Sequence, residues 1–337
     1  MPAGKRFFGW SVAWAAFGLA VFAWGIGFYG PPVFLHASRG WSISEISSAI
    51  TLHFLLSALV IVYLPEIHRR FGIRRTTFGG AVATAMGLAG WSHASQSWQL
   101  LLAAIQSAVG WATTSGAALN AIVARWFERE RPKAISLAFN GASLGGVLFV
   151  PAWVYLIDRL GFQVAALSVA AIAIAVVTFL SVRYLGPSPA NLGLTLDGAE
   201  CPEPVSKADP RLSRCEIVRL PRFLTLSTAF ALGLFAQIGL LTHLIVRLAP
   251  EVGVTNAGLL VSLASLSAVV GRTLAGGWIM DRDRRVAAAL NFGVQVCGVL
   301  LLILGHGWLL LTLGCVLFWL GYRQPDVAAA IDRVEGV

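Results

Sequence analysis

Long apolar stretches recur along this chain, and short polar breaks separate most of them. About 20 apolar residues in a helix are enough to cross a hydrocarbon core roughly 30 Å thick. Lipid offers a backbone no hydrogen-bond partners, so each stretch is expected to close its own hydrogen bonds as an α-helix. We predict ten transmembrane helices, over residues 8–34, 43–65, 75–93, 97–124, 133–157, 162–185, 222–248, 257–279, 286–305 and 307–322.

The small share of charged residues supports this reading. Charged side chains make up 12% of the 337 residues and hydrophobic ones 57%, whereas a soluble domain carries about 25% charged residues. The excess apolar area must therefore face a lipid bilayer. The net charge of +9 lies in the breaks between apolar stretches, which indicates membrane topology and no nucleic-acid partner. The sequence predicts an all-α polytopic membrane protein.

Basic residues gather in alternate breaks between the predicted helices. The clusters are Lys5 and Arg6; Arg69, Arg70, Arg74 and Arg75; Arg125, Arg129, Arg131 and Lys133; Arg183, Lys207, Arg211, Arg214, Arg219 and Arg222; and Arg282, Arg284 and Arg285. The intervening breaks have only Arg39, Arg159 and Arg247 near them. Because cytoplasmic loops carry the excess of Lys and Arg, we predict a multi-pass protein of the cell (inner or plasma) membrane with a cytoplasmic N-terminus.

A polar, proline-rich connector divides the predicted helices into two groups. We predict a six-helix N-terminal bundle over residues 1–185, a cytoplasmic linker over 186–221 and an incomplete four-helix C-terminal bundle over 222–322. The break after the second helix reads PEIHRRFGIRR in the first group and GWIMDRDRR in the second. Basic clusters at matching places indicate that the two groups are repeats of one unit.

A loop motif connects this pattern to a known family. Gly277 stands four residues before the pair Asp281-Arg282, a spacing that resembles the loop motif of the major facilitator superfamily of secondary transporters. The sequences Arg125-Trp126-Phe127 and GASLGG from Gly141 are similar to its monocarboxylate-porter and oxalate/formate-antiporter branch. The resemblance implies two helix bundles that expose a midplane site alternately to the two sides of the membrane.

The first half departs from that motif. Pro65 and Arg69 occupy the positions of its glycine and aspartate, so an Asp-based gating contact is absent there, although Glu66 could partly replace it. The residues expected to act in gating are Gly277, Asp281, Arg282, Arg69 and Arg70.

The end of the chain also departs from the family. The resemblance implies twelve helices, whereas ten are predicted, and residues 323–337 form an atypical polar tail. Back-translation with GC-rich codons and a shift of one base turns this tail into a continuation that looks like normal helix. We expect that a frameshift truncated a twelve-helix ancestor. The coding DNA tests this idea, because a one-base change must restore two further apolar stretches.

Arg272 is the sharpest candidate for a site residue. It lies nine residues before Asp281 in the helix predicted over 257–279, about 13 Å along a helix and close to the middle of the hydrocarbon core. A guanidinium there costs about 3 kcal/mol by insertion scales, so it must face a cavity or a partner. The resemblance implies that it pairs with a substrate carboxylate. The alternative is a structural bond to a neighbouring helix.

Other polar residues inside the predicted helices could line the same passage. Gln106, Thr113 and Asn120 recur every seven residues and share a face if the helix over 97–124 is continuous. The candidate substrate-binding residues are Arg272, Asn120, Gln106, Tyr29, Asn140, His243 and Gln237. The alternative for each is a structural role, because polar and small side chains also hold membrane helices together.

The sequence contains no recognisable catalytic motif. Its four cysteines form no CxxC pair, and Walker, HExxH and GxSxG patterns are absent. We predict no enzyme activity, no metal and no cofactor. The expected function is secondary active transport of a small, monocarboxylate-like organic anion by a monomer in the lipid bilayer, in symport or antiport with a proton or a counter-anion. The alternatives are an inactive truncated remnant and an exporter of apolar drugs.

Overall fold

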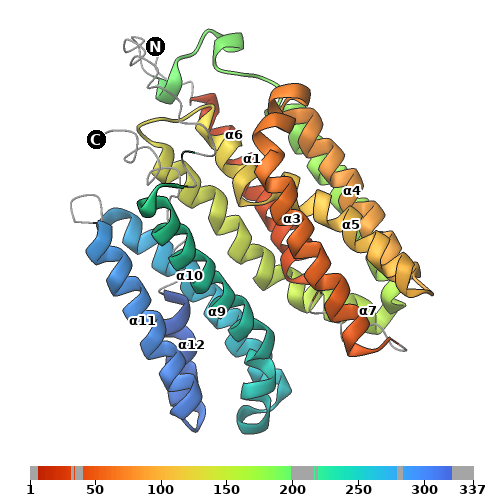
Figure 1. The fold of residues 1–337 in the computed structure, drawn as a ribbon, viewed down its shortest axis with the longest axis vertical. Helices are drawn as coiled ribbons and strands as arrows, with labels where there is room; N and C mark the ends of the chain where they lie inside the picture. The colour runs from red at the N-terminus through yellow and green to blue at the C-terminus, as the bar shows by residue number, and fades with distance from the viewer. Residues whose placement is uncertain are drawn as a thin grey trace. The chain divides into compact units, whose positions relative to one another are not determined.

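The structure, a computed structural model, describes residues 7–31, 34, 41–198, 216, 219–278 and 284–320. All regular elements in these residues are helices, and the predicted all-α fold class is confirmed. The chain divides into two compact units, Met1–Glu200 and Cys201–Val337, whose helices are drawn in Figure 1. The division falls inside the connector predicted over 186–221, and the tail over 323–337 lies outside the described residues.

Each unit is a set of apolar helices. The first contains α1 (Phe8–Ala23), the π-turn η1 (Trp24–Phe28), α3 (Ile43–Phe71), α4 (Ile73–His93), α5 (Ser97–Thr114), α6 (Gly116–Ala124), α7 (Arg131–Tyr184) and two short 3-10 turns, η2 (Ala190–Leu192) and η3 (Leu196–Gly198). The second contains α9 (Pro221–Val252), α10 (Val254–Trp278), α11 (Arg284–Leu304) and α12 (Trp308–Leu320).

The helix predicted over 97–124 is wrong as a continuous element. It breaks at Ser115, whose backbone is extended (φ −73°, ψ −173°). The hydroxyls of Thr113, Thr114 and Ser115 donate to carbonyls of the preceding turn, which is a bonding pattern that bends and weakens helices. The predicted shared face of Gln106 and Asn120 therefore does not exist as one straight stripe, because the two residues lie on different helices.

The two helices predicted over 133–157 and 162–185 are both present within α7. They are separated at Gly161, where the backbone is non-helical (φ 75°, ψ 162°) and a side chain would be strained. One predicted boundary differs from the structure. The helix predicted over 8–34 is regular only to Ala23 and continues as the π-turn η1.

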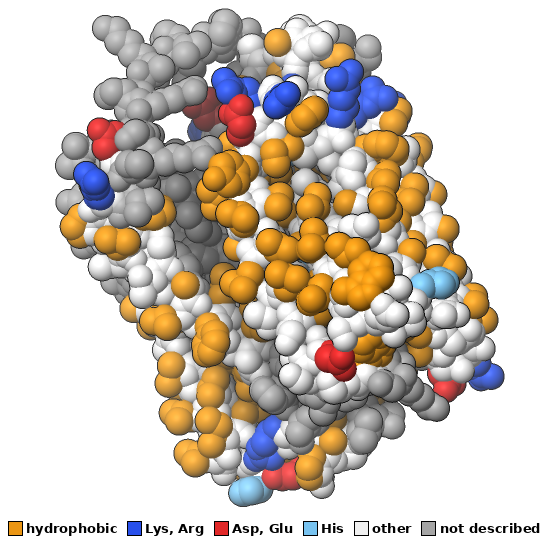
Figure 2. Space-filling model, turned by 45° about the vertical axis from the view of Figure 1, so that its right-hand side comes forward, with side chains coloured by type: hydrophobic (Ala, Val, Ile, Leu, Met, Phe, Trp, Pro, Cys, Tyr) orange, Lys and Arg blue, Asp and Glu red, His pale blue; other side chains and the backbone are white. Residues whose placement is uncertain are grey.

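The outer surfaces of the described helices are apolar. Leu55, Phe179 and Phe235 expose 65%, 60% and 80% of their area, and soluble proteins rarely expose contiguous apolar surface on this scale. On the face shown in Figure 2, hydrophobic side chains spread along the helix flanks and charged ones gather near helix ends. Among the described residues, four stretches are long and apolar enough to cross a membrane: Phe8–Phe28, Ser44–Phe71, Arg131–Tyr184 and Phe223–Leu240.

A carboxylate from the connector binds the turn that precedes α7. The Asp197 side chain accepts hydrogen bonds from the backbone N–H groups of Glu128 (3.1 Å), Arg129 (2.7 Å) and Glu130 (3.2 Å). Its own N–H donates to the Trp126 carbonyl at 3.0 Å. The connector is thus fastened to the α6–α7 turn, so both lie at the same end of the first unit.

We expect Asp197→Ala to destabilise the first unit by about 1–2 kcal/mol, because three N–H groups of the α6–α7 turn lose their acceptor. Asp197→Asn should cost less, since asparagine keeps one acceptor oxygen and tolerates the left-handed backbone at this position (φ 56°). Thermal unfolding of the detergent-purified protein measures both changes. Asp158→Asn, at an exposed acid, is the control; equal melting of the Asp197→Ala and control proteins would contradict the role.

A second carboxylate joins α9 to the turn between α11 and α12. Glu251 lies beyond the apolar stretch of α9 and accepts hydrogen bonds from Arg247 (3.1 Å), His306 (2.9 Å) and the Gly307 N–H (2.8 Å). Arg247 also donates to the Gly305 carbonyl at 3.0 Å. The Gly307 N–H, followed by His306 and Arg247, lowers the pKa of Glu251 from 4.5 to about 2.

This pKa shift predicts an acid-dependent loss of stability. The folded carboxyl has a pKa of about 2 and the unfolded one about 4.5, so the stabilisation is complete above pH 4.5 and is lost as the pH falls toward 2. Melting curves between about pH 6 and pH 3 should show a smaller decrease for Glu251→Gln than for the wild type. An identical decrease in both proteins would rule out Glu251 as the source.

Candidate functional site

Glycines on α7 bring α1 and α7 into backbone contact. A Cβ on Gly145 would lie 2.6 Å from the Val21 carbonyl oxygen, and one on Gly141 would overlap the Phe17 carbonyl. Such close approach through small residues is typical of helices that pack in membranes. A Cβ on Gly146 would lie 2.6 Å from the Tyr29 ring, so the predicted site residue Tyr29 packs on the same small-residue run.

The π-turn η1 comes directly after the part of α1 that α7 contacts. The Tyr29 N–H donates to the Trp24 carbonyl at 2.9 Å, a bond one residue longer than in an α-helix. The turn leaves the Gly25 carbonyl free to accept from the buried indole N–H of Trp153 at 3.1 Å. Single π-turns inside α-helices occur often at functional sites, and this one lies beside the cavity of the first unit.

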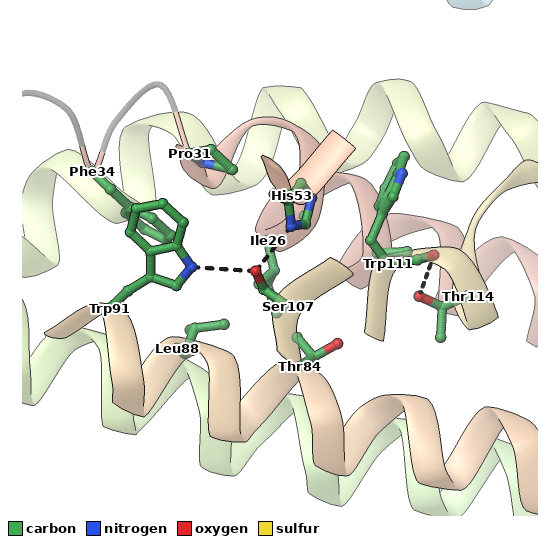
Figure 3. A pocket seen from close by; sticks show the side chains of 12 residues that line it. Ile26, Pro31, Phe34, His53, Thr84, Leu88, Trp91, Ser107, Trp111 and Thr114 are labelled. Carbon is green, nitrogen blue, oxygen red and sulfur yellow. Dashed lines mark hydrogen bonds between the residues drawn. The ribbon is translucent and has the colours of Figure 1, made fainter. Parts of the chain in front are cut away.

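Three helices meet at a buried imidazole next to η1. His53 of α3 is 1% exposed, and its Nδ1 lies 2.9 Å from Oγ of Ser107 on α5. The Trp91 indole of α4 donates to the same oxygen at 3.2 Å, and Ser107 itself donates to the Ala104 carbonyl at 3.1 Å. Figure 3 shows His53 and Trp91 converging on Ser107 from opposite sides.

These side chains border a small enclosed cavity. It is lined by Ala23, Ile26, Gly27, Pro31, Phe34, His53, Thr84, Leu88, Trp91, Ser107, Trp111 and Thr114 (Figure 3). About 20 Å³ is open to the centre of a water molecule, which is room for a single water. Nε2 of His53 is buried and has no hydrogen-bond partner in the described structure. The cavity can therefore bind one small polar species and is too small for an organic anion.

The predicted residues of the first unit lie in different surroundings. Asn120 is half-buried on α6 and donates to the Gly116 carbonyl at 3.0 Å, while its Oδ1 is buried and has no partner among the described residues. Gln106 is half-buried on α5 next to Ser107, but successive helical residues point about 100° apart. Asn140 is half-buried on α7. The structure brings none of these residues to the His53 cavity, since they are not among its lining residues.

In the second unit, one predicted residue forms a polar pair between helices. Gln237 of α9 donates to Oε1 of Gln295 on α11 at 3.2 Å, and Gln295 is 7% exposed. Arg272 and Gly277 lie in α10 and His243 lies in α9, but their side-chain surroundings fall outside the described part of the chain. Asp281 and Arg282 lie outside the described residues altogether.

The basic break of the first half is exposed. Arg69 forms an ion pair with Glu66 at 2.7 Å, with side chains 79% and 51% exposed, and Arg70 lies over the Phe71 ring at 5.5 Å. Glu66 is thus engaged one turn away on its own helix. An exposed pair of this kind contributes at most about 1 kcal/mol, and the gating roles of Arg69 and Arg70 stay predictions.

A match to the Major Facilitator Superfamily covers residues 8–324. The chain belongs to this superfamily. Its members are multi-pass membrane transporters, and the match indicates transport rather than enzyme activity, as the sequence predicted.

Several relatives are also similar to this transporter. It is 28% identical over 239 residues to monocarboxylate transporter 13 of Bos taurus, covering 69% of this chain and 52% of the relative. It is 27% identical over 285 residues to monocarboxylate transporter 11 of Mus musculus, covering 81% and 60%. A fujikurins efflux protein of Gibberella fujikuroi is 31% identical over 150 residues, covering 43% and 32%. The chain thus spans between about half and three fifths of the two monocarboxylate transporters.

Sequence analysis missed the polar centre of the first unit. His53 and Ser107 are 54 residues apart, and neither belongs to a motif. The sequence did contain one indication of this site, because a histidine in the middle of the apolar stretch 43–65 needs a partner inside the protein. The seven-residue pattern in the helix over 97–124 instead favoured Gln106, the neighbour of Ser107, as a site residue.

The close approach of α1 and α7 predicts the effect of a single methyl group. Gly145→Ala should destabilise this transporter by about 1–3 kcal/mol, because the new Cβ forces the two helices apart. Gly79→Ala is the matched control, since a Cβ there meets nothing within 4 Å. Thermal unfolding followed by tryptophan fluorescence compares them. A Gly145→Ala protein as stable as the control would show that the helices are not in contact.

Proposed function

We propose that this protein is a secondary active transporter of a small organic anion, with a carboxylate as the recognised group. The observation that carries the proposal is the similarity to monocarboxylate transporter 11 over 81% of this chain. The described helices also bury polar side chains in both units, at His53 and at Gln295, as a polar passage through lipid requires.

Arg272 is the proposed anion-binding residue. It lies in α10 nine residues before Asp281, about 13 Å along the helix and well inside a hydrocarbon core. A guanidinium binds a carboxylate through two parallel hydrogen bonds and keeps its charge at every physiological pH. Neutral amides such as Gln237 and Asn120 would add hydrogen bonds without a competing negative charge.

The proposal includes the membrane arrangement of the chain. We propose that the N-terminal bundle over 1–185 and the shorter group over 222–322 provide alternating access to a midplane site, in the cell membrane and with the N-terminus on the cytoplasmic side. Support comes from the basic clusters in alternate breaks and from Asp197, which holds the connector at the basic α6–α7 turn.

Counterflow tests the role of Arg272 directly. Proteoliposomes loaded with unlabelled pyruvate should accumulate labelled pyruvate. Arg272→Ala should reduce the rate by about tenfold or more, because a charge-assisted carboxylate bond is lost, and Arg272→Lys should retain part of it. Arg219→Ala, at an exposed arginine, is the control.

Two outcomes would contradict the proposal at different levels. Equal counterflow in Arg272→Ala and wild type would remove Arg272 from the mechanism. Wild-type protein that moves neither pyruvate nor any other small carboxylate would remove the function.

A second candidate is export of apolar compounds. The similarity to the fujikurins efflux protein over 150 residues supports it, as does an aromatic interior that contains Trp91 and Trp111. Export would show as extrusion of an apolar fluorescent dye from proteoliposomes, and it should not depend on Arg272. Dye extrusion without anion counterflow would favour this candidate over the first.

A further inference from the structure

The position of His53 is unusual for a titratable side chain. It lies ten residues after the first residue of α3, about 15 Å along the helix and hence near the middle of a hydrocarbon core about 30 Å thick. It is 1% exposed. An ionisable residue at this depth is expensive and usually marks a function.

Among the described residues around the cavity, no other charge competes with the imidazole. None of the other residues that line the cavity is titratable. Helices α5 and α6 and the π-turn η1 contain no acidic or basic residue, and those of α4 are Arg74, Arg75 and His93, at its two ends. On α3 itself the nearest acid is Glu45, eight residues and about 12 Å away along the helix.

The contacts of Ser107 favour one tautomer of His53. The Ser107 oxygen accepts from Trp91, and its hydroxyl lies 3.1 Å from the Ala104 carbonyl. When this hydroxyl donates to Ala104, the contact at 2.9 Å with Nδ1 of His53 is donated by Nδ1–H, since the role of each ring nitrogen depends on the tautomer. In that tautomer Nε2 carries the lone pair of the neutral ring, and it is the atom that is buried without a hydrogen-bond partner among the described residues.

The cavity provides what a proton on Nε2 would need. The backbone groups of Gly27, in the π-turn, and of Ala104 lie near the imidazole ring. The open volume of about 20 Å³ admits one water molecule. An imidazolium would thus donate from Nδ1 to Ser107 and from Nε2 to the water or to Gly27, with no buried N–H group unpaired.

We propose that His53 is a proton-binding site of this transporter and that the cavity holds the single water through which the proton reaches Nε2. On uptake, hydronium gives a proton to the lone pair of Nε2: one O–H bond breaks, one N–H bond forms, and the hydronium becomes water. Release reverses the step. No other bond changes. The physiological role of this site rests on the proposed anion transport. A proton and a carboxylate anion carry opposite charges, so moving one of each together would be electrically neutral.

Two measurements on the reconstituted full chain test the site. The first is proton-driven uptake of labelled pyruvate into proteoliposomes, compared with counterflow at equal pH on both sides. An acid-outside gradient should accelerate uptake by the wild type several-fold. His53→Gln should lose this acceleration and keep counterflow, since glutamine can hydrogen-bond to Ser107 but cannot bind a proton at neutral pH. His93→Gln, at an exposed histidine of α4, should keep both activities.

The second measurement does not depend on transport. Solid-state NMR of protein labelled with ¹⁵N-histidine should show one imidazole, identified by its loss in His53→Gln, whose Nε2 changes from unprotonated to protonated between about pH 8 and pH 4. Ser107→Ala should shift this titration, because it removes the acceptor of Nδ1–H.

The outcomes separate the two proposals. If the wild type shows no counterflow, the proposed function fails and the NMR titration alone decides the site. If His53→Gln still responds to the proton gradient, or if Nε2 of His53 carries a proton throughout the pH range or never gains one, the proton site is overturned while anion transport stands.

Discussion

The absence of hydrogen-bond partners in lipid governs this structure. Every polar group placed inside the hydrocarbon core must find its partner within the protein, and a group that fails to do so costs several kcal/mol. The observed contacts follow this rule: Trp153 donates to the Gly25 carbonyl freed by the π-turn, and Ser107 joins His53, Trp91 and Ala104. Nε2 of His53 and Oδ1 of Asn120 are exceptions among the described residues, and Nε2 lies beside room for one water.

Close packing and the polar centre depend on each other. Gly141 and Gly145 allow α7 to touch the backbone of α1, and the wide turn of η1 directly follows that contact. The turn frees the Gly25 carbonyl, which accepts from the Trp153 indole, and Gly27 of the same turn lines the His53 cavity. The proposed proton site therefore belongs to the scaffold that joins α1, α3, α4 and α5.

Much of the fold followed from the sequence, and the failures have identifiable causes. Apolar stretches located nearly every helix, because transfer into lipid is favourable residue by residue over about 20 positions. The break at Ser115 was missed because the apolar pattern continues across it. Three hydroxyls at this point donate hydrogen bonds to carbonyls of the preceding turn. The run from Gly141 to Gly146 was recognised as part of a family pattern, but its contact with Phe17, Val21 and Tyr29 was not. The candidate site residues Gln237 and Asn120 lie in the described part of the chain. The hydrogen bond between Gln237 and Gln295 on α11 was not predicted.

The sequence by itself determined the fold class, the alternation of basic breaks and the resemblance to the Major Facilitator Superfamily that the match over residues 8–324 confirms. These properties are local, because hydropathy and short motifs are carried by neighbouring residues. Only the tertiary structure decided that His53 meets Ser107 across 54 residues and that Asp197 binds the N–H of Glu130, 67 residues earlier in the chain. Such bonds depend on how helices pack, and a hydrogen bond forms only within a few tenths of an ångström of 2.9 Å, a condition that no pattern along a single helix specifies.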